Sequence, residues 1–203
     1  MKSEKEIMLS GQLYDPSDKE LVALREKAHR LSLEYNMTLE TDGEKRYSIL
    51  KKLVPDLGED AYLQGPIQID YGCFTSIGDR SYANFNLVIL DTCRVTIGND
   101  VYMGPNVSLL TAMHPLRWQE RNTYRKDDGG LTDREYGKPI TIEDNCWIGG
   151  NVTVVGGVTI GEGSVIGAGS VVTKDIPPNS VAVGNPCKVI RQITEKDSIE
   201  NVF

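Results

Sequence analysis

The chain has 203 residues, 39% of them hydrophobic and 25% charged, which is enough to bury a full core as one domain with at most a small appendage. Its net charge of −7 and the absence of a basic stripe argue against general nucleic-acid binding, because phosphate contacts need clustered Lys and Arg. Aromatic residues are scarce at 7%, whereas glycine is plentiful at 20 residues, so we expect many turns and small core side chains.

The N-terminal residues are mostly charged or polar. The stretch Met1 to Glu6 lacks the apolar core of a signal peptide, and no apolar run approaches the length of a transmembrane helix. We therefore expect a cytoplasmic location and no membrane partner.

Two amphipathic helices are expected in the first quarter of the chain. Apolar residues recur at three- and four-residue spacing over residues 17–34, and Ser17 with Glu20 has the spacing of a capping box. A second, shorter helix is predicted over residues 41–53. These helices would form an N-terminal cap over residues 1–58.

From residue 65 the helical periodicity gives way to a period of six residues. Six consecutive units in the C-terminal half begin with Ile or Val without a slip: Ile142, Ile148, Val154, Ile160, Ile166 and Val172. An earlier set of unit starts follows the same period with one shift of two residues: Ile77, Ala83, Ile89, Ile97, Met103 and Leu109. Such a strict repeat is typical of a solenoid.

Each unit is expected to form a short strand that ends at a sharp turn, and three units close a triangular coil of about eighteen residues. The first and fifth residues of a unit would point inward. The second residue is often Gly, which we attribute to the turn conformation that Gly tolerates. A β-sandwich would instead give period-two alternation and irregular turn spacing. The predicted fold is therefore mainly β, with a parallel β-helix over residues 59–190 and a C-terminal tail over residues 191–203.

The four cysteines form no C-x-x-C pair and have no accompanying His cluster, so neither a metal site nor a redox motif is expected. Cys93 and Cys146 fall at the small fifth position of their repeat units. That position favours buried and inert thiols.

The chain contains two histidines, and they differ in context. His29 lies on the first expected helix among charged residues, which favours surface or cap packing. His114 ends a coil where the repeat breaks, so residues 115–138 would leave the solenoid as an excursion. Long irregular excursions are more often functional than accidental. His114 is therefore either a general base or a side chain that only hydrogen-bonds the loop.

Several stretches are more distinctive than the repeat itself. They are Tyr82-Ala83-Asn84-Phe85-Asn86, Pro105-Asn106-Val107, Thr111-Ala112-Met113-His114-Pro115, Trp147-Ile148-Gly149 and the run from Gly157 to Arg191. With them the chain resembles the hexapeptide acyltransferases, and more closely their galactoside and maltose O-acetyltransferase branch. The resemblance implies a left-handed coil, a homotrimer with sites between subunits, and acetyl transfer from acetyl-CoA to a hydroxyl of a galactoside, glucose or maltose type of sugar without a metal.

The resemblance also assigns roles to residues. It implies that His114 is the catalytic base and that the backbone N–H of Gly150 stabilises the oxyanion. The matching acceptor-binding residues are Asp15, Asp70, Asn84 and Thr92. The matching residues for acetyl-CoA are Trp147, Gly150, Ala168, Thr173, Lys174, Lys188 and Arg191. Positions 70 and 92 depart from the galactoside enzymes, so the resemblance does not name the sugar.

Each assignment has a plainer alternative. Asp15 and Asn84 fit ordinary turns, Ala168 fits coil packing, and the pair of Lys188 with Arg191 fits a solvated tail. Trp118 in the excursion fits either stacking on a sugar ring or packing beneath the loop.

Other functional classes are less compatible with the sequence. A γ-type carbonic anhydrase needs three His ligands, and a nucleotidyltransferase needs a nucleotide-binding domain for which the cap is too short. A non-catalytic solenoid would need neither a His at the excursion nor a terminal cationic pair. A xenobiotic acetyltransferase shares the fold, the base and the donor, so it stays an open alternative.

Overall fold

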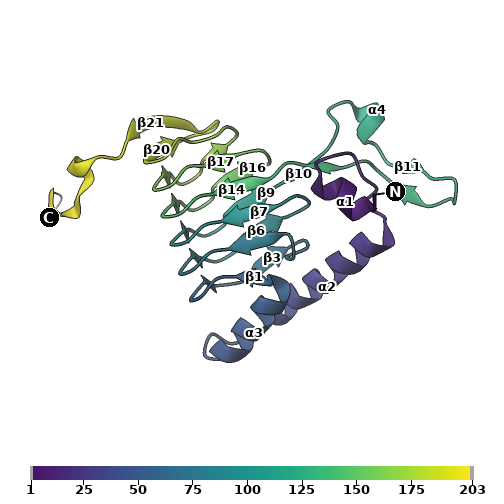
Figure 1. Ribbon diagram of the computed structural model, residues 1–203, viewed down its shortest axis with the longest axis horizontal. Helices are drawn as coiled ribbons and strands as arrows, with labels where there is room; N and C mark the ends of the chain where they lie inside the picture. Colours follow the sequence, from purple (N-terminus) through teal and green to yellow (C-terminus); the bar gives the residue numbers. More distant parts are fainter. Residues whose placement is uncertain (1, 202–203) are drawn as a thin grey trace.

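The computed structural model describes residues 2–201 as a triangular solenoid of stacked coils with a helical cap along its N-terminal end (Figure 1). The cap helices are α1 (Glu4–Leu9), α2 (Lys19–Asn36) and α3 (Gly43–Leu53). No helix within the described residues is long and apolar enough to cross a membrane.

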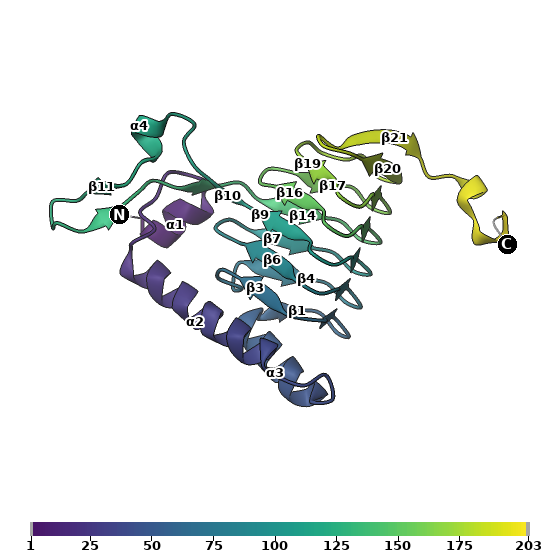
Figure 2. The ribbon, with the colours of Figure 1, turned by 180° about the vertical axis from the view of Figure 1, so that it is seen from behind.

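Three sheets, parallel except for the last strand of the second, form the sides of the solenoid, as the coils in Figures 1 and 2 show from opposite directions. The first sheet contains β1 (Asp56–Leu57), β4 (Thr75–Ile77), β7 (Val95–Ile97), β14 (Ile140–Ile142) and β17 (Thr159–Ile160). The second contains β2 (Tyr62–Leu63), β5 (Tyr82–Ala83), β8 (Tyr102–Met103), β15 (Trp147–Ile148), β18 (Val165–Ile166), β20 (Ser180–Val183) and β21 (Lys188–Gln192). The third contains β3 (Ile67–Ile69), β6 (Leu87–Leu90), β9 (Ser108–Leu110), β16 (Thr153–Val155) and β19 (Val171–Val172).

The predicted inward positions are confirmed. All twelve unit starts are at most 2% exposed: Ile77, Ala83, Ile89, Ile97, Met103, Leu109, Ile142, Ile148, Val154, Ile160, Ile166 and Val172. The fifth positions are buried too: Ser81, Cys93, Val101, Val107, Cys146, Val152, Val158, Ser164 and Ser170. Stacked coils with the same inward positions therefore bury one continuous core, and this burial stabilises strands that are too short to be stable alone.

The reason given above for the glycines at the second position is wrong. The left-handed backbone sits two residues later, at the fourth position, where φ is 57° at Arg80, 60° at Asn106 and 59° at Asn151. The second-position glycines are required by stacking instead, since a Cβ on Gly104 would lie 2.6 Å from the Gly150 nitrogen of the next coil. The absence of a side chain there lets successive backbones approach closely.

The helix starts differ from the prediction. Helix α2 begins at Lys19, two residues after the predicted start at residue 17. Asp18 caps it instead of Ser17, and the Asp18 carboxylate accepts from the backbone N–H groups of Glu20 and Leu21. Helix α1 was missed, although Ser3 and Glu6 form a complete capping box. Its Met8 packs in a small separate core with Tyr14, Leu21 and Tyr71.

The solenoid extends beyond both of its predicted boundaries. β1 lies inside the range predicted as cap, and β21 crosses the boundary at residue 190 and pairs antiparallel with β20. After β21 the chain leaves the solenoid through two short turns of 3₁₀ helix, η1 (Glu195–Asp197) and η2 (Ile199–Asn201), as Figure 1 shows.

The excursion, which is the teal segment in Figures 1 and 2, lies beside the cap near α1. Its elements are β10 (Ala112–Met113), α4 (Trp118–Arg121), β11 (Tyr124–Arg125), β12 (Leu131–Thr132) and β13 (Tyr136–Gly137). β11 and β12 form a hairpin, and β13 returns antiparallel to β10. An isolated bridge between Tyr14 and Glu135 joins the returning chain to the cap.

Candidate active site

The coil geometry places the predicted site residues on two edges of the solenoid. Each coil passes through the first, second and third sheets in turn, so a second corner joins the second sheet to the third, and a third corner joins the third sheet back to the first. Residues that follow second-sheet strands share the second corner: Asn84, Gly150 and Ala168. Residues that follow third-sheet strands, or β10, share the third corner: Asp70, Thr92, His114, Thr173 and Lys174. The third sheet therefore separates the predicted base from the predicted oxyanion donor within one chain.

The His114 side chain leaves the solenoid at the start of the excursion and is 42% exposed. Its Nδ1 lies 3.8 Å from Oδ2 of Asp133. One nitrogen of His114 and one carboxylate oxygen each from Asp133 and Glu135 lie within 4.8 Å of one another. Two acids thus flank the exposed imidazole, an arrangement that suits a base that becomes positively charged when it takes a proton. It is also the one group in residues 2–201 whose atoms lie close enough together to ligate a metal.

Glu135 is itself held by the cap. The buried Tyr14 donates its hydroxyl to Oε2 of Glu135 at 2.7 Å, and the Tyr14 backbone N–H donates to the Glu135 carbonyl at 3.0 Å. Burial and the neighbouring Glu135 charge together raise the pKa of Tyr14 far above its ordinary value of 10, so this hydroxyl stays a donor. The position of Glu135 beside His114 is therefore fixed from the cap side.

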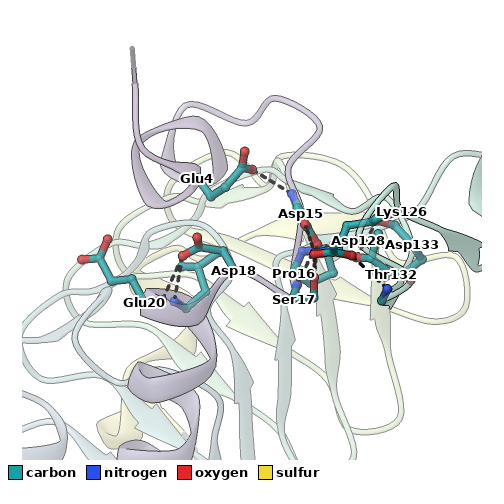
Figure 3. A network of polar contacts seen from close by, with 12 residues as sticks. Glu4, Asp15, Pro16, Ser17, Asp18, Glu20, Lys126, Asp128, Thr132 and Asp133 are labelled. Carbon is teal, nitrogen blue, oxygen red and sulfur yellow. Dashed lines mark hydrogen bonds and ion pairs between the residues drawn. The ribbon is translucent and has the colours of Figure 1, made fainter.

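Asp15 lies at the centre of a polar network between cap and excursion (Figure 3). Its Oδ1 accepts from the Ser17 backbone N–H at 2.9 Å, from the Ser17 hydroxyl at 2.7 Å and from the Thr132 hydroxyl. Its Oδ2 accepts from Nζ of Lys126 at 3.1 Å. Burial opposes ionisation, but the hydrogen bonds from Thr132, Ser17 and Lys126 outweigh it and hold the pKa of Asp15 well below its usual range.

The other predicted acceptor residues have distinct surroundings. Oδ1 of Asp70 lies 3.1 Å from Nε2 of His29, so His29 is a hydrogen-bond partner on the cap. Thr92 is buried, and its hydroxyl pairs with that of Thr111 at 3.1 Å, which gives it a packing role. Asn84 is half-buried, and its Oδ1 accepts from the Phe85 backbone N–H in a local turn. Its amide nitrogen remains available to a ligand.

The backbone N–H of Gly150 donates to no protein acceptor within the described residues, and the same is true of Ala168 one coil further on. At the first corner, which joins the first sheet to the second, the matching N–H groups of Asp79 and Asn99 are bonded to side chains of the next coil. Gly150 therefore presents a fixed, unoccupied donor on the second corner. This is the arrangement that stabilisation of an oxyanion needs.

The predicted donor residues continue along the outside of the second sheet. Trp147 on β15 is 59% exposed and follows the register across β18 and β20 to Arg191 on β21. A β-bulge at Ile190 sets two residues of β21 against one of β20, so Lys188 and Arg191 pair with the outward residues Val183 and Val181. The bulge therefore brings two cations three residues apart onto one face.

Arg191 is already partly engaged in this structure. Its guanidinium contacts Asp197 at 2.8 Å, and the hydrogen bond from Arg191 lowers the pKa of that carboxyl. Lys188 has no ion-pair partner among residues 2–201. Thr173 and Lys174 are exposed at the third corner, so one chain does not bring them together with Gly150.

The expectation of buried cysteines in the repeat is confirmed. Cys93 and Cys146 are 4% and 1% exposed, and burial raises the pKa of the Cys146 thiol to about 11. Both thiols therefore stay protonated at neutral pH and serve packing.

Several residues at the site were not anticipated from the sequence. Asp133 and Glu135 lie at the base, and Lys126, Thr132 and Tyr14 hold the excursion that carries them. The two acids occur two residues apart just before the repeat resumes, a spacing that puts side chains on a common face of an extended segment and could have pointed to them. The tether to Asp15 spans more than a hundred residues of sequence and left no local signal.

Comparison with known proteins identifies relatives of both the cap and the solenoid. Residues 7–58 match the maltose acetyltransferase hexapeptide capping motif, and residues 139–174 match the hexapeptide repeat of succinyl-transferase. The chain is 42% identical over 188 residues to the galactoside O-acetyltransferase of Escherichia coli, covering 93% of this chain and 88% of that one.

Solved structures show the same architecture. A maltose O-acetyltransferase from Clostridium difficile is 46% identical, with a TM-score of 0.87 over 96% of this chain and 99% of that one. A galactoside acetyltransferase in complex with coenzyme A is 40% identical, with a TM-score of 0.88 over 97% of this chain and 94% of that one.

Fold and site together define an acyltransferase of the hexapeptide-repeat class, built on a left-handed parallel β-helix with an N-terminal helical cap, as predicted. Within that class the chain belongs to the family of the galactoside and maltose O-acetyltransferases.

Proposed function

We propose that this protein transfers the acetyl group of acetyl-CoA to a hydroxyl of a sugar of the galactoside, glucose or maltose type. The observation that carries the proposal is that one chain carries both an acid-flanked, exposed His114 and an unoccupied Gly150 N–H, on the same fold as the coenzyme A-bound galactoside acetyltransferase. No metal takes part in the proposed reaction.

In the proposed reaction the sugar hydroxyl attacks the thioester carbonyl directly. Nδ1 of His114 lies beside Asp133, so Nε2 is the nitrogen that takes the hydroxyl proton as the new C–O bond forms. The carbonyl oxygen becomes an oxyanion, to which the Gly150 N–H donates. The C–S bond then breaks, and the leaving thiolate receives the proton from His114. The products are the acetylated sugar and CoA with a free thiol.

We infer that a complete site needs a second copy of the chain, because the two groups lie on different corners of the solenoid. Gly150 lies on the second corner, where the strands of the third sheet begin, and His114 lies on the third corner, where they end. Apposition of the third corner of one copy to the second corner of the next completes the site, and a closed ring satisfies every such contact. We therefore propose a homotrimer with three sites between subunits.

Acetyl-CoA would lie along the second corner and the outer face of the second sheet. Trp147 and Ala168 flank the path from Gly150, and Lys188 with Arg191 form the cationic end of that face. The phosphates of CoA fit this end, because a cationic pair offsets the net negative charge of the protein locally. Thr173 and Lys174 would reach the donor bound between this copy and its neighbour.

The sugar would bind where the two corners meet. Asn84 offers a free amide on the second corner, and Asp70 lies on the third corner. Trp118 is 60% exposed in the excursion, which makes it available to stack on a sugar ring. A hydroxyl of a xenobiotic is the second candidate acceptor, because the same base and donor would serve it.

The proposal is tested by following release of the CoA thiol from acetyl-CoA while galactosides, glucose, maltose and chloramphenicol are offered in turn. We expect release with at least one sugar and none with chloramphenicol. Release with chloramphenicol alone would replace the sugar by the xenobiotic acceptor. If none of the acceptors raises thiol release above the rate of spontaneous hydrolysis, the proposed reaction is wrong.

A further inference from the structure

The contacts of Asp15 point to a role other than binding of the acceptor. Its carboxylate already accepts four hydrogen bonds, three of them on Oδ1. An ionised carboxylate offers about four lone-pair sites in all. Thr132, one of the donors, is only 5% exposed. The side chains of Asp15 and Lys126 are half-buried, so a sugar hydroxyl at this carboxylate would have to compete with charge-assisted hydrogen bonds that are already formed.

The donors come from both sides of the joint between cap and excursion. Ser17 belongs to the cap, whereas Lys126 and Thr132 belong to the β11–β12 hairpin (Figure 3). Nζ of Lys126 also donates to the Ser17 hydroxyl at 2.8 Å. We call the four residues Asp15, Ser17, Lys126 and Thr132 the latch. Charge-assisted hydrogen bonds of this kind are about twice as strong as neutral ones, so the latch holds the hairpin on the cap.

The latch lies next to the segment that flanks the base. Thr132 is anchored by Asp15, and Glu135 is anchored by Tyr14 through both its carbonyl and its carboxylate. Asp133 lies between these two anchors, with Oδ2 3.8 Å from Nδ1 of His114. A residue fixed on both sides along the chain has little freedom to move away from the ring.

We propose that Asp15 is a positioning residue: through Lys126 and Thr132 it docks the excursion on the cap and thereby holds Asp133 and Glu135 against His114. This inference rests on the proposed function and deepens it. A carboxylate beside Nδ1 stabilises the imidazolium that forms when Nε2 takes the hydroxyl proton. Release of the latch removes that carboxylate from its place in the transition state and leaves the sugar and CoA contacts of the solenoid, such as those of Asn84 and Gly150, intact.

The expected kinetic signature is a fall in kcat with little change in KM. Asp15→Asn, Lys126→Met and Thr132→Val should each lower kcat about tenfold to hundredfold, because a displacement of about 1 Å at a catalytic group has effects of this size. The KM for the acceptor should stay within about twofold. Lys126→Arg keeps the charge and the donors and should retain most of the activity.

The chain offers a matched control on the same cap. Lys5 forms an ion pair with Glu20 and, among residues 2–201, makes no hydrogen bond or ion pair with the excursion, so Lys5→Met removes a comparable lysine without touching the latch. This variant should keep the kcat of the unchanged protein. If Lys5→Met lowers kcat as much as Lys126→Met does, removal of any lysine that pairs with the cap has this effect, and the latch has no special role.

Hydrogen exchange supplies a readout that is independent of activity. In Asp15→Asn and Lys126→Met, the amides of residues 124–135 should exchange faster, while those of the solenoid should not change. If instead Asp15→Asn raises the acceptor KM at constant kcat and Lys126→Met is silent, Asp15 is an acceptor ligand and the positioning role is wrong. The proposed function would survive that result, because it fails only if His114→Ala retains turnover or no sugar is acetylated.

Discussion

The solenoid and the excursion are built on different principles. Every coil of the solenoid repeats the same inward positions, so one apolar layer predicts the next, and its backbone hydrogen bonds follow from parallel register. The excursion has two short strand pairs, and its position depends on a few side chains such as Lys126 and Tyr14 that contact the cap. The solenoid thus provides a rigid frame, whereas the excursion carries the groups that act on the base.

The largest expected effect concerns the excursion side, at the base itself. His114→Ala should lower kcat by roughly two to four orders of magnitude, because a positioned general base contributes about this much to the rate. The variant should unfold at an unchanged temperature, since His114 is exposed. Thiol release under saturating sugar and acetyl-CoA measures the loss. Near-normal turnover in a folded variant would remove His114 from the mechanism.

On the solenoid side, the corresponding change is Gly104→Ala. A Cβ there would meet the Gly150 nitrogen at 2.6 Å, so the stack must open, and we expect a loss of about 3 kcal/mol in the free energy of unfolding. Gly43→Ala at the start of α3 is the control, because a Cβ there meets nothing within 4 Å. Chemical denaturation of both variants tests the comparison. Equal stabilities would show that close stacking does not require glycine.

A third prediction concerns a buried acid at the third corner. Asp91 is fully buried and accepts from the Tyr71 backbone N–H at 2.8 Å and the Thr75 hydroxyl at 2.9 Å. Burial outweighs these hydrogen bonds and raises the pKa of its carboxyl from the ordinary 3.8 to about 6. The folded chain therefore binds this proton more tightly than the unfolded chain does.

The sign of the pH effect follows from that difference. The cost of ionising Asp91 is absent below about pH 4 and fully present above about pH 6, so its contribution to stability falls as the pH rises through this window. Asp91→Asn should remove that dependence and raise the free energy of unfolding at pH 7 by at most about 3 kcal/mol. Urea unfolding of both proteins at pH 4 and pH 7 measures it. If Asp91→Asn is less stable than the unchanged protein at pH 7, the ionised carboxylate stabilises the fold and the prediction is wrong.

The smallest effect is expected at the cationic end of the second sheet. The double change of Lys188→Ala with Arg191→Ala should raise the KM for acetyl-CoA about tenfold, keep kcat, and flatten the salt dependence of kcat/KM. Asp197→Asn should lower that KM, because it frees the Arg191 guanidinium. Initial rates at low and high salt test both. An unmoved KM in the double variant at low salt would make the pair a solvated tail.

The same contrast explains what could be predicted from the sequence. The solenoid was predictable because the period of six is a local signal that repeats, and each unit start from Ile77 to Val172 is buried as expected. The role of Gly150 was implied by the resemblance and not by the period. The role of the second-position glycines was not predictable, because it depends on the distance to the next coil.

The excursion was predictable only as a break in the repeat. Its contacts join residues such as Asp15 and Thr132, which are far apart in sequence and belong to no repeat. The β-bulge that places Lys188 and Arg191 on one face also depends on pairing with β20. The helix start at Asp18 was missed because Ser17 donates to Asp15 instead of capping the helix.

The central claim is that the reaction requires groups from two copies of the chain, the base from one third corner and the amide of Asn84 with the Gly150 N–H from a neighbouring second corner. Its most direct measurement mixes two inactive variants, His114→Ala and Asn84→Ala, by joint refolding at equal amounts. If the site lies between subunits, random trimers should regain roughly a quarter of the activity of the unchanged protein, because one site in four pairs an intact His114 with an intact Asn84. If each site lies within one chain, the mixture should stay as inactive as either variant alone, and that result would contradict the account.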